Sequence, residues 1–180
     1  MSKLFVISGS SGVGKGTVIK EFLKRNPEYK LSVSCTTRKP REGEVHGKNY
    51  FFLTREEFES CIDRNEFLEW AEFSGNMYGT QRPYIEEKLA QGKKLILEID
   101  TQGALNVKKI MPDVVLIFIL PPSFEELEAR LRGRHTETEE AIQKRLASTK
   151  LELENSKYFD YEVINDSIEN AVLKLEEIML

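Results

Sequence analysis

Nine residues near the start of the chain, GSSGVGKGT (9–17), have the types and spacing of a site for phosphate groups. The pattern Gly9-x4-Gly14-Lys15 stands between an apolar run typical of a buried strand and a run typical of a helix. Glycines let backbone N–H groups turn inward around phosphate oxygens, the helix N-terminus adds unpaired N–H groups, and Lys15 adds a mobile positive charge. A glycine-rich turn with a surface lysine is the alternative, which the flanking patterns disfavour.

The usual metal ligand of such a loop is absent. Gly16 stands where Ser or Thr normally holds Mg²⁺, and Thr17 comes one residue late, so we expect this loop to contact metal only through water. Asp100 ends the buried run KLILEID (94–100), where a second acidic group commonly meets the metal or its waters. Glu98 points to the same side of that strand. Capping of the next helix is the alternative role for Asp100.

A basic turn further along the chain has the side chains to clamp a second phosphate group. Arg38 and Arg41 flank Pro40, and Tyr50 follows in the same irregular segment. Two guanidinium forks and a phenol suit bidentate recognition of one phosphate monoester. A solvated basic loop is the alternative.

Glu69 lies among large apolar residues in FLEWAEF (67–73). A carboxylate there could accept from two adjacent donors, and the pairing edge of guanine offers N1–H and N2–H₂, whereas adenine offers no such pair. Glu72 is a nearby competitor for this role, since its spacing of three places it on the opposite face of a strand. The choice of Glu69 rests on the register of the family motif given below. An ordinary solvent-facing strand residue is the alternative for Glu69.

Strands that alternate with helices must position these residues. Apolar runs predict strands over 3–8, 94–100, 114–120 and 161–166, and helical patterns cover 13–24, 82–91, 102–110, 123–132, 137–154 and 167–179. This alternation predicts an α/β fold whose parallel sheet is flanked by helices on both faces. Residues 34–80 break the rhythm and predict an inserted subdomain of short strands with a helix near 55–63. The spacing of Thr136 and Glu139 predicts a capping box at the start of a further helix.

Four segments follow the loop in the order and spacing seen in guanylate kinases: SVSCTTRKPREGEVHGKNYFF, FLEWAEFSGNMYGT, LEIDTQGA and RLRGRHTETEEAIQKRL. The chain resembles that family over nearly its whole length. The resemblance implies one domain (1–180) with a P-loop NTPase core (1–33, 81–125 and 146–180), a GMP-binding insertion (34–80) and a lid (126–145). It also implies transfer of the γ-phosphoryl group of ATP to GMP, with Mg²⁺ accompanying ATP.

The resemblance assigns roles to residues at the matching positions. ATP is expected to contact Gly9, Ser10, Ser11, Gly12, Val13, Gly14, Lys15, Gly16, Thr17, Arg130, Arg134 and Asn165, the last beside adenine. GMP is expected to contact Ser34, Arg38, Arg41, Tyr50, Glu69, Tyr78, Thr80 and Asp100. Catalytic roles fall to Lys15, Arg38, Arg134 and Arg145, and Asp100 is the expected metal residue, directly or through water. Relatives often have aspartate at position 98, so Glu98 is a departure.

Three arginines of the implied lid have a structural alternative. Arg130 and Arg134 are four residues apart and would share a helix face, and Arg145 follows after a break. When the implied lid closes over ATP, the positive charges of these arginines would stabilise the negative charge that is spread over the transferring phosphoryl group. Glu126 offers Arg130 an ordinary i,i+4 ion pair instead, whereas Ala141 leaves Arg145 without one.

Composition narrows the partners. The net charge of −4, from 26 basic and 30 acidic residues, disfavours nucleic acid as a partner. The two cysteines, Cys35 and Cys61, fit neither a disulfide framework nor a four-ligand metal site, as expected for a reduced cytoplasmic chain. The run LFVI is too short for a signal or membrane segment. The apolar stripe in IENAVLKLEEIML suits either the core or a subunit interface, so the oligomeric state stays open.

Two other functions compete with this interpretation. GKGT also occurs in adenylate-type kinases, which prefer another base, and Glu69 opposes that assignment. Guanylate-kinase-like domains also serve as non-catalytic scaffolds for phosphorylated partners. Such scaffolds can dispense with Lys15, Arg134 and Arg145, all of which are present here.

Overall fold

The computed structural model describes residues 4–180, so Lys3, predicted to begin the first strand, lies outside the described residues. The strands are β1 (Leu4–Gly9), β2 (Tyr29–Leu31), β3 (Cys35–Thr36), β4 (Phe51–Phe52), β5 (Phe67–Phe73), β6 (Asn76–Gln81), β7 (Lys94–Glu98), β8 (Val115–Leu120) and β9 (Tyr161–Ile164). The helices are α1 (Lys15–Arg25), α2 (Arg55–Asp63), α3 (Arg82–Ala90), α4 (Thr101–Ile110), α5 (Phe124–Gly133), α6 (Glu139–Asn155) and α7 (Ile168–Met179), with a 3-10 turn at Ser156–Tyr158. None of the helices in 4–180 is long and apolar enough to cross a bilayer.

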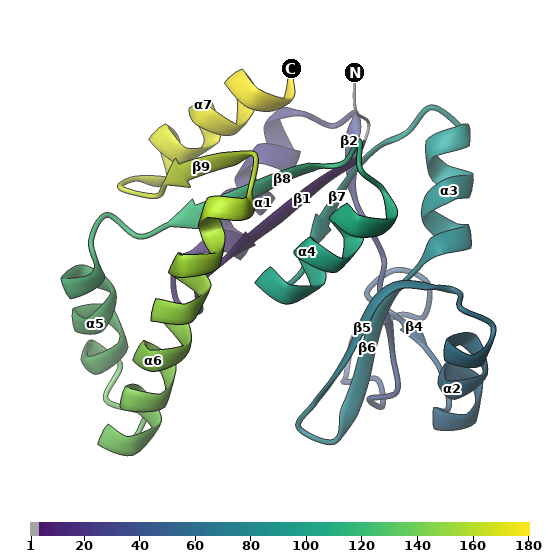
Figure 1. Cartoon of the computed structure of the whole chain (residues 1–180), viewed down its shortest axis with the longest axis horizontal. Coiled ribbons are helices and arrows are strands. Elements are labelled where there is room, and N and C mark those ends of the chain that lie inside the picture. The colour runs from purple at the N-terminus through teal and green to yellow at the C-terminus, as the bar shows by residue number, and fades with distance from the viewer. Residues whose placement is uncertain (1–3) are drawn as a thin grey trace.

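Five parallel strands, in the order β2-β7-β1-β8-β9, form the central sheet (Figure 1). Successive residues of β1 point to opposite faces: Phe5 and Ile7 pack with α1 and α7, whereas Leu4 and Val6 pack with α3 and α4. Because helices cover both faces, β1 and β8 are continuous apolar runs rather than alternating ones. The predicted α/β fold with a helix-flanked parallel sheet is confirmed.

The ends of the core strands differ slightly from the prediction. Strand β7 stops at Glu98 rather than at residue 100, because Asp100 leaves the sheet to cap α4 and accepts a hydrogen bond from the N–H of Gly103 at 2.6 Å. The edge strand β2 was not predicted, since three residues carry too little pattern to be recognised. The cap places the carboxyl group of Asp100 just beyond the carboxyl end of β7.

A second sheet, in the order β4-β3-β6-β5, forms with α2 the segment between β2 and α3. Phe58 of α2 stacks on Phe67 of β5 with ring centroids 4.4 Å apart, and Cys35 and Met77 complete a buried core. This small core fixes β5 and β6, whose residues line the cleft described below.

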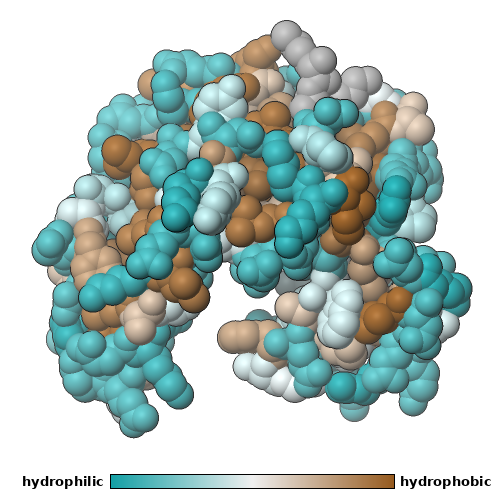
Figure 2. Space-filling model, viewed as in Figure 1, coloured by the Kyte–Doolittle hydropathy of each residue, from teal (hydrophilic) through white to brown (hydrophobic). Residues whose placement is uncertain are grey.

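Helices α5 and α6 form an arm on the other side of the molecule, packed through Leu127, Leu131, Ile142 and Leu146. The N-cap of α6 is Thr138, whose hydroxyl accepts from the N–H of Ala141, so the predicted capping box at Thr136 is wrong. Thr138 directly precedes the helix, and its hydroxyl is the one within reach of the free N–H groups of the first turn. Figure 2 shows the molecule hollowed between this arm and the small sheet.

Candidate active site

The loop between β1 and α1 is fixed by its glycines and by one brace. Gly12 and Gly14 have φ angles of 81° and 85°. Residues other than glycine rarely adopt this backbone conformation, because their Cβ atom clashes with the backbone. A Cβ on Gly9 would stand 2.8 Å from the carbonyl oxygen of Ile119, so only glycine fits against β8. Asn165, which follows β9, donates from Nδ2 to the carbonyl oxygen of Val13 at 2.7 Å. The loop thus runs in a set conformation to the N-terminus of α1, a natural anion site.

Lys15 begins α1 among three carboxylates. Burial lowers the pKa of its ammonium group, while the negative charges of Glu98, Glu152 and Asp100 act in the opposite direction. Glu152 reaches this point from α6, beside Ser10 and Lys15, and burial raises the pKa of its carboxyl group. The ammonium group of Lys15 therefore lies near carboxylates from three separate elements: the end of β7, the N-cap of α4 and the helix α6.

A cleft of about 310 Å³ separates the central sheet from the small sheet. Apolar side chains of Ala71, Phe73 and Ile99 line it together with polar ones, a mixture typical of pockets for small molecules. It brings together five residues expected to contact GMP: Ser34, Tyr50, Glu69, Tyr78 and Asp100.

Glu69 is the buried acid of this cleft. Thr80 donates from its hydroxyl to Oε1 of Glu69 at 2.8 Å. Burial raises the pKa of Glu69 to about 7, the hydrogen bond from Thr80 opposes the rise, and the charge of Asp100 adds to it. A Cβ on Gly103 would lie 3.0 Å from both Glu69 Oε2 and Asp100 Oδ1, so this glycine makes room for two neighbouring carboxyl groups.

Arg38 follows β3 of the small sheet and forms an ion pair with Glu44. Its two terminal nitrogens donate to the two oxygens of Glu44 at 2.9 and 3.0 Å, and its guanidinium carbon lies 5.4 Å from the ring centroid of Tyr50. Hydrogen bonds from Arg38 and from the backbone N–H of Arg41 lower the pKa of Glu44 to about 2. The guanidinium of Arg38 is therefore already oriented in the geometry that suits a carboxylate or phosphate.

Known proteins match this chain over nearly its full length. The family model described as guanylate kinase matches residues 1–180. A guanylate kinase from Prochlorococcus marinus is 53% identical over 176 residues, which cover 98% of this chain and 96% of the relative. One from Synechocystis sp. is 50% identical over 177 residues, covering 98% and 93%. This chain belongs to the guanylate kinase family.

A solved structure agrees with this guanylate kinase in fold. The crystal structure of guanylate kinase from Anaplasma phagocytophilum is 36% identical and matches with a TM-score of 0.73, over 97% of this chain and 82% of that chain. The predicted family and enzyme class are thereby confirmed.

A second cavity of this guanylate kinase, about 250 Å³, lies beside the loop. Its lining includes Gly14, Thr17, Arg130 and Asn165, all expected at the ATP site. Arg130 also donates to Glu126 at 2.6 Å, which is the helix ion pair considered as its alternative. The side-chain Nδ2 of Asn165 is already hydrogen-bonded to the loop. An adenine contact at this residue would therefore involve its other polar atoms, the side-chain oxygen and the backbone groups.

Three predicted arginines stand apart from both cavities. Arg134 caps the C-terminus of α5 and is exposed, and Arg41 is exposed as well. Arg145 pairs with Glu137 at 2.6 Å, a partner eight residues earlier that the i,i+4 rule did not anticipate. Within residues 4–180 none of the three donates a hydrogen bond to loop 9–17, so their predicted roles require the arm and the small sheet to approach each other.

The oxygen donors near the loop fit a metal that arrives with the nucleotide. Residues 4–180 contain no group of three or more His, Cys, Asp or Glu side chains arranged to hold an ion. Glu98 and Asp100 supply two exposed carboxylates beside Lys15. Kinase Mg²⁺ is typically bound by one or two carboxylates together with phosphate oxygens and waters, which this donor set matches.

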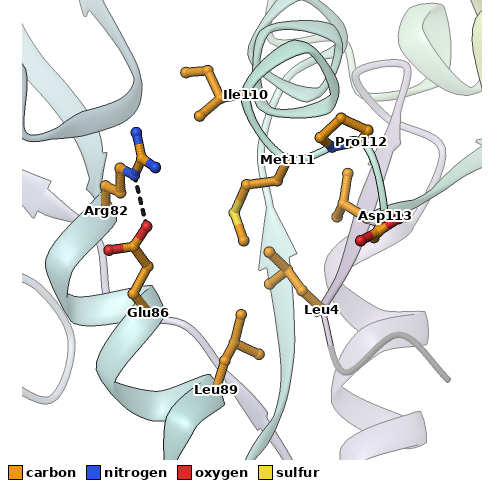
Figure 3. Close-up of a pocket in the computed structure, with 9 residues that line it drawn as sticks. Leu4, Arg82, Glu86, Leu89, Ile110, Met111, Pro112 and Asp113 are labelled. Carbon is orange, nitrogen blue, oxygen red and sulfur yellow. Dashed lines mark hydrogen bonds and ion pairs between the residues drawn. The ribbon is translucent and has the colours of Figure 1, made fainter.

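A further cavity, about 430 Å³, lies at the opposite end of the central sheet (Figure 3). Leu4, Leu89 and Met111 line it, and Arg82 donates to Glu86 at 2.7 Å on its rim. No residue expected to bind nucleotide lines it, so this cavity is separate from the candidate active site.

Three residues that contact members of the candidate site were not predicted from the sequence: Glu44, Gly103 and Glu152. Glu44 lies six residues after Arg38 in one short turn, so their opposite charges could have indicated the ion pair. Gly103 had a weaker signal, since a glycine in the first turn of a helix often marks a close approach. Glu152 had none, because only the packing of α6 brings it to the loop.

Proposed function

We propose that this guanylate kinase transfers the γ-phosphoryl group of ATP to GMP within the hollow between the arm and the small sheet. ATP binds with its phosphates in loop 9–17, and GMP binds in the cleft that contains Glu69. The observation that carries the proposal is the carboxyl group of Glu69, held by Thr80 in that cleft. It is an acceptor for the two adjacent donors on the pairing edge of guanine.

The remaining cleft residues bind the other parts of GMP. Arg38, Arg41 and Tyr50 hold its phosphate, so Arg38 exchanges part of its pairing with Glu44 for phosphate oxygens. Ser34 and Tyr78 complete the cleft around the nucleotide. The small sheet thereby presents the phosphate of GMP toward Lys15.

Transfer is in line and needs no covalent protein intermediate. An oxygen of the GMP phosphate forms the new P–O bond to the γ-phosphorus while the bond to ADP breaks. Lys15, Arg130, Arg134 and Arg145 neutralise the charge that repels the two substrates, once the arm closes and excludes water. Asp100 would hold Mg²⁺, directly or through water, and the ion supplies positive charge to the phosphate oxygens.

We also propose the cytoplasm as the site of action, without nucleic acid or membrane as a partner. The two cysteines are buried and unpaired, as in a reducing compartment, and the acidic net charge disfavours nucleic acid.

A side-by-side assay with ATP, Mg²⁺ and each of GMP, AMP, UMP and CMP tests the function. GMP should be strongly preferred, and Glu69→Gln should reduce turnover of GMP selectively. Glu72→Gln is the matched control, because Glu72 lies on the same strand but is exposed and pairs with Arg55. A preference for AMP, or unchanged GMP selectivity in Glu69→Gln, contradicts the proposed base recognition. No turnover of any acceptor points to a binding module.

A further inference from the structure

Glu44 connects the two arginines that are expected to hold the phosphate of GMP. Its carboxylate accepts from Nη1 and Nη2 of Arg38 at 2.9 and 3.0 Å, and its Oε1 also accepts from the backbone N–H of Arg41 at 2.7 Å. The N–H of Glu44 donates to the carbonyl oxygen of Arg41 at 3.0 Å, and Gly43 has a φ of 82°, as the third residue of a type II turn requires. One side chain therefore fixes both the guanidinium of Arg38 and the turn that carries Arg41.

This pairing is shielded from water and leaves one edge of Arg38 beyond the reach of Glu44. The side chains of Arg38 and Glu44 are only 16% and 19% exposed. Nη1 donates both of its N–H groups, one to Glu44 and one to the carbonyl oxygen of Lys39 at 3.0 Å. Nη2 donates one N–H to Glu44, so its second N–H and the N–H of Nε remain, together on one edge of the planar group. Two adjacent donors of this kind suit two oxygens of a phosphate.

The other neighbours of Arg38 belong to the GMP cleft. The guanidinium carbon lies 5.4 Å from the ring centroid of Tyr50, and the rings of Tyr50 and Tyr78 are 6.2 Å apart. The hydroxyl of Tyr78 is also close enough to interact with the guanidinium. Both tyrosines line the cleft, and Glu44 does not. Arg38 thus links a carboxylate outside the cleft lining to the residues inside it.

We propose that Glu44 is a positioning residue for the phosphate of GMP, which holds the guanidinium of Arg38 from outside the cleft and keeps Arg41 in the same turn. The inference rests on the proposed function, in which these arginines bind that phosphate. When GMP binds, the hydrogen bond from Nη1 to Glu44 stays, while Nη2 and Nε turn to phosphate oxygens. An arginine that is already fixed loses less conformational entropy on binding, which increases the affinity for GMP.

The competing explanation is that Glu44 only competes with the phosphate for Arg38. The two explanations predict opposite signs. A competing carboxylate repels the phosphate and occupies its partner, so its removal would tighten GMP binding. A positioning carboxylate aligns the donors, so its removal weakens GMP binding even though a negative charge is lost.

Isothermal titration of GMP into the full-length enzyme without ATP measures this sign. Glu44→Gln should weaken GMP binding about tenfold, the effect of one lost hydrogen bond between charged groups. The amide oxygen of glutamine can still accept from the N–H of Arg41, so the change acts mainly on Arg38. In steady-state kinetics KM for GMP should rise and KM for ATP should not change. Glu42→Gln is the matched control and should bind GMP as wild type does, since Glu42 lies in the same turn, is exposed and makes no side-chain hydrogen bond or ion pair within residues 4–180.

A second background separates positioning from damage to the turn. In Arg38→Ala there is no guanidinium for Glu44 to orient, so adding Glu44→Gln to Arg38→Ala should not weaken GMP binding further. If Glu44→Gln only distorted the turn, the loss would be equal in both backgrounds. An equal loss, or unchanged or tighter GMP binding in Glu44→Gln alone, overturns the inference while the GMP preference of wild type still stands. If wild type binds no GMP, the proposed function itself fails.

Discussion

Lowering the pH from about 8 to about 6 should weaken GMP binding about tenfold through Glu69 alone. Burial raises the pKa of Glu69 to about 7, and guanine needs the ionised form, because a protonated carboxyl group cannot accept from both donors. The ionised fraction is then about 90% at pH 8 and about 10% at pH 6. The apparent dissociation constant scales inversely with that fraction, which gives the tenfold change.

Isothermal titration of GMP into enzyme without ATP or metal measures this change. The phosphate of GMP also titrates, near pH 6. The dissociation constant of GMP for wild type is therefore divided, at each pH, by that for Glu69→Gln, in which only the phosphate contribution to the pH dependence remains. Titrations at pH 6 in buffers of different ionisation enthalpy should show about one more proton released by wild type than by Glu69→Gln.

A second variant fixes the sign of the effect. Thr80→Val removes the hydrogen bond that stabilises the carboxylate, so the pKa of Glu69 should rise and the midpoint of GMP binding should move to higher pH. Equal pH profiles for wild type and Glu69→Gln, or tighter GMP binding at low pH in the divided profile, would refute the reasoning.

Three further predictions follow from single contacts. Glu69→Gln should stabilise the ligand-free protein by about 1–3 kcal/mol above pH 7, in chemical denaturation. Below pH 4.5 the Glu69 carboxyl group is protonated in both states, so it costs the wild type no stability. Between pH 4.5 and about 7 the unfolded chain releases this proton while the folded state keeps it, so the wild type loses stability over this range and the glutamine variant does not. Gly103→Ala should raise KM for GMP, since its Cβ would press on Glu69 and Asp100 at 3.0 Å; an unchanged KM would show that α4 shifts freely. Asn165→Ala should lower stability by about 1 kcal/mol and raise KM for ATP, because the brace on Val13 is lost; thermal melts and kinetics check both.

The core of the fold was predictable because its signals are local. Apolar runs such as 114–120 and the helix pattern near 167–179 depend only on neighbouring residues, and β8 and α7 appear within a residue of those bounds. The errors lie where local signals are weak: the three-residue strand β2, and the start of α6, where two threonines competed for the cap.

The sequence by itself determined the phosphate loop, the alternation of strands and helices, and the family, since each depends on residue types in fixed order along the chain. Only the tertiary structure placed Glu152 beside Lys15, Gly103 between two carboxyl groups, and Glu98 beside Gly16. These residues are far apart in the chain or belong to different elements. Which side chains meet there depends on strand register and helix packing, which spacing along one chain does not specify.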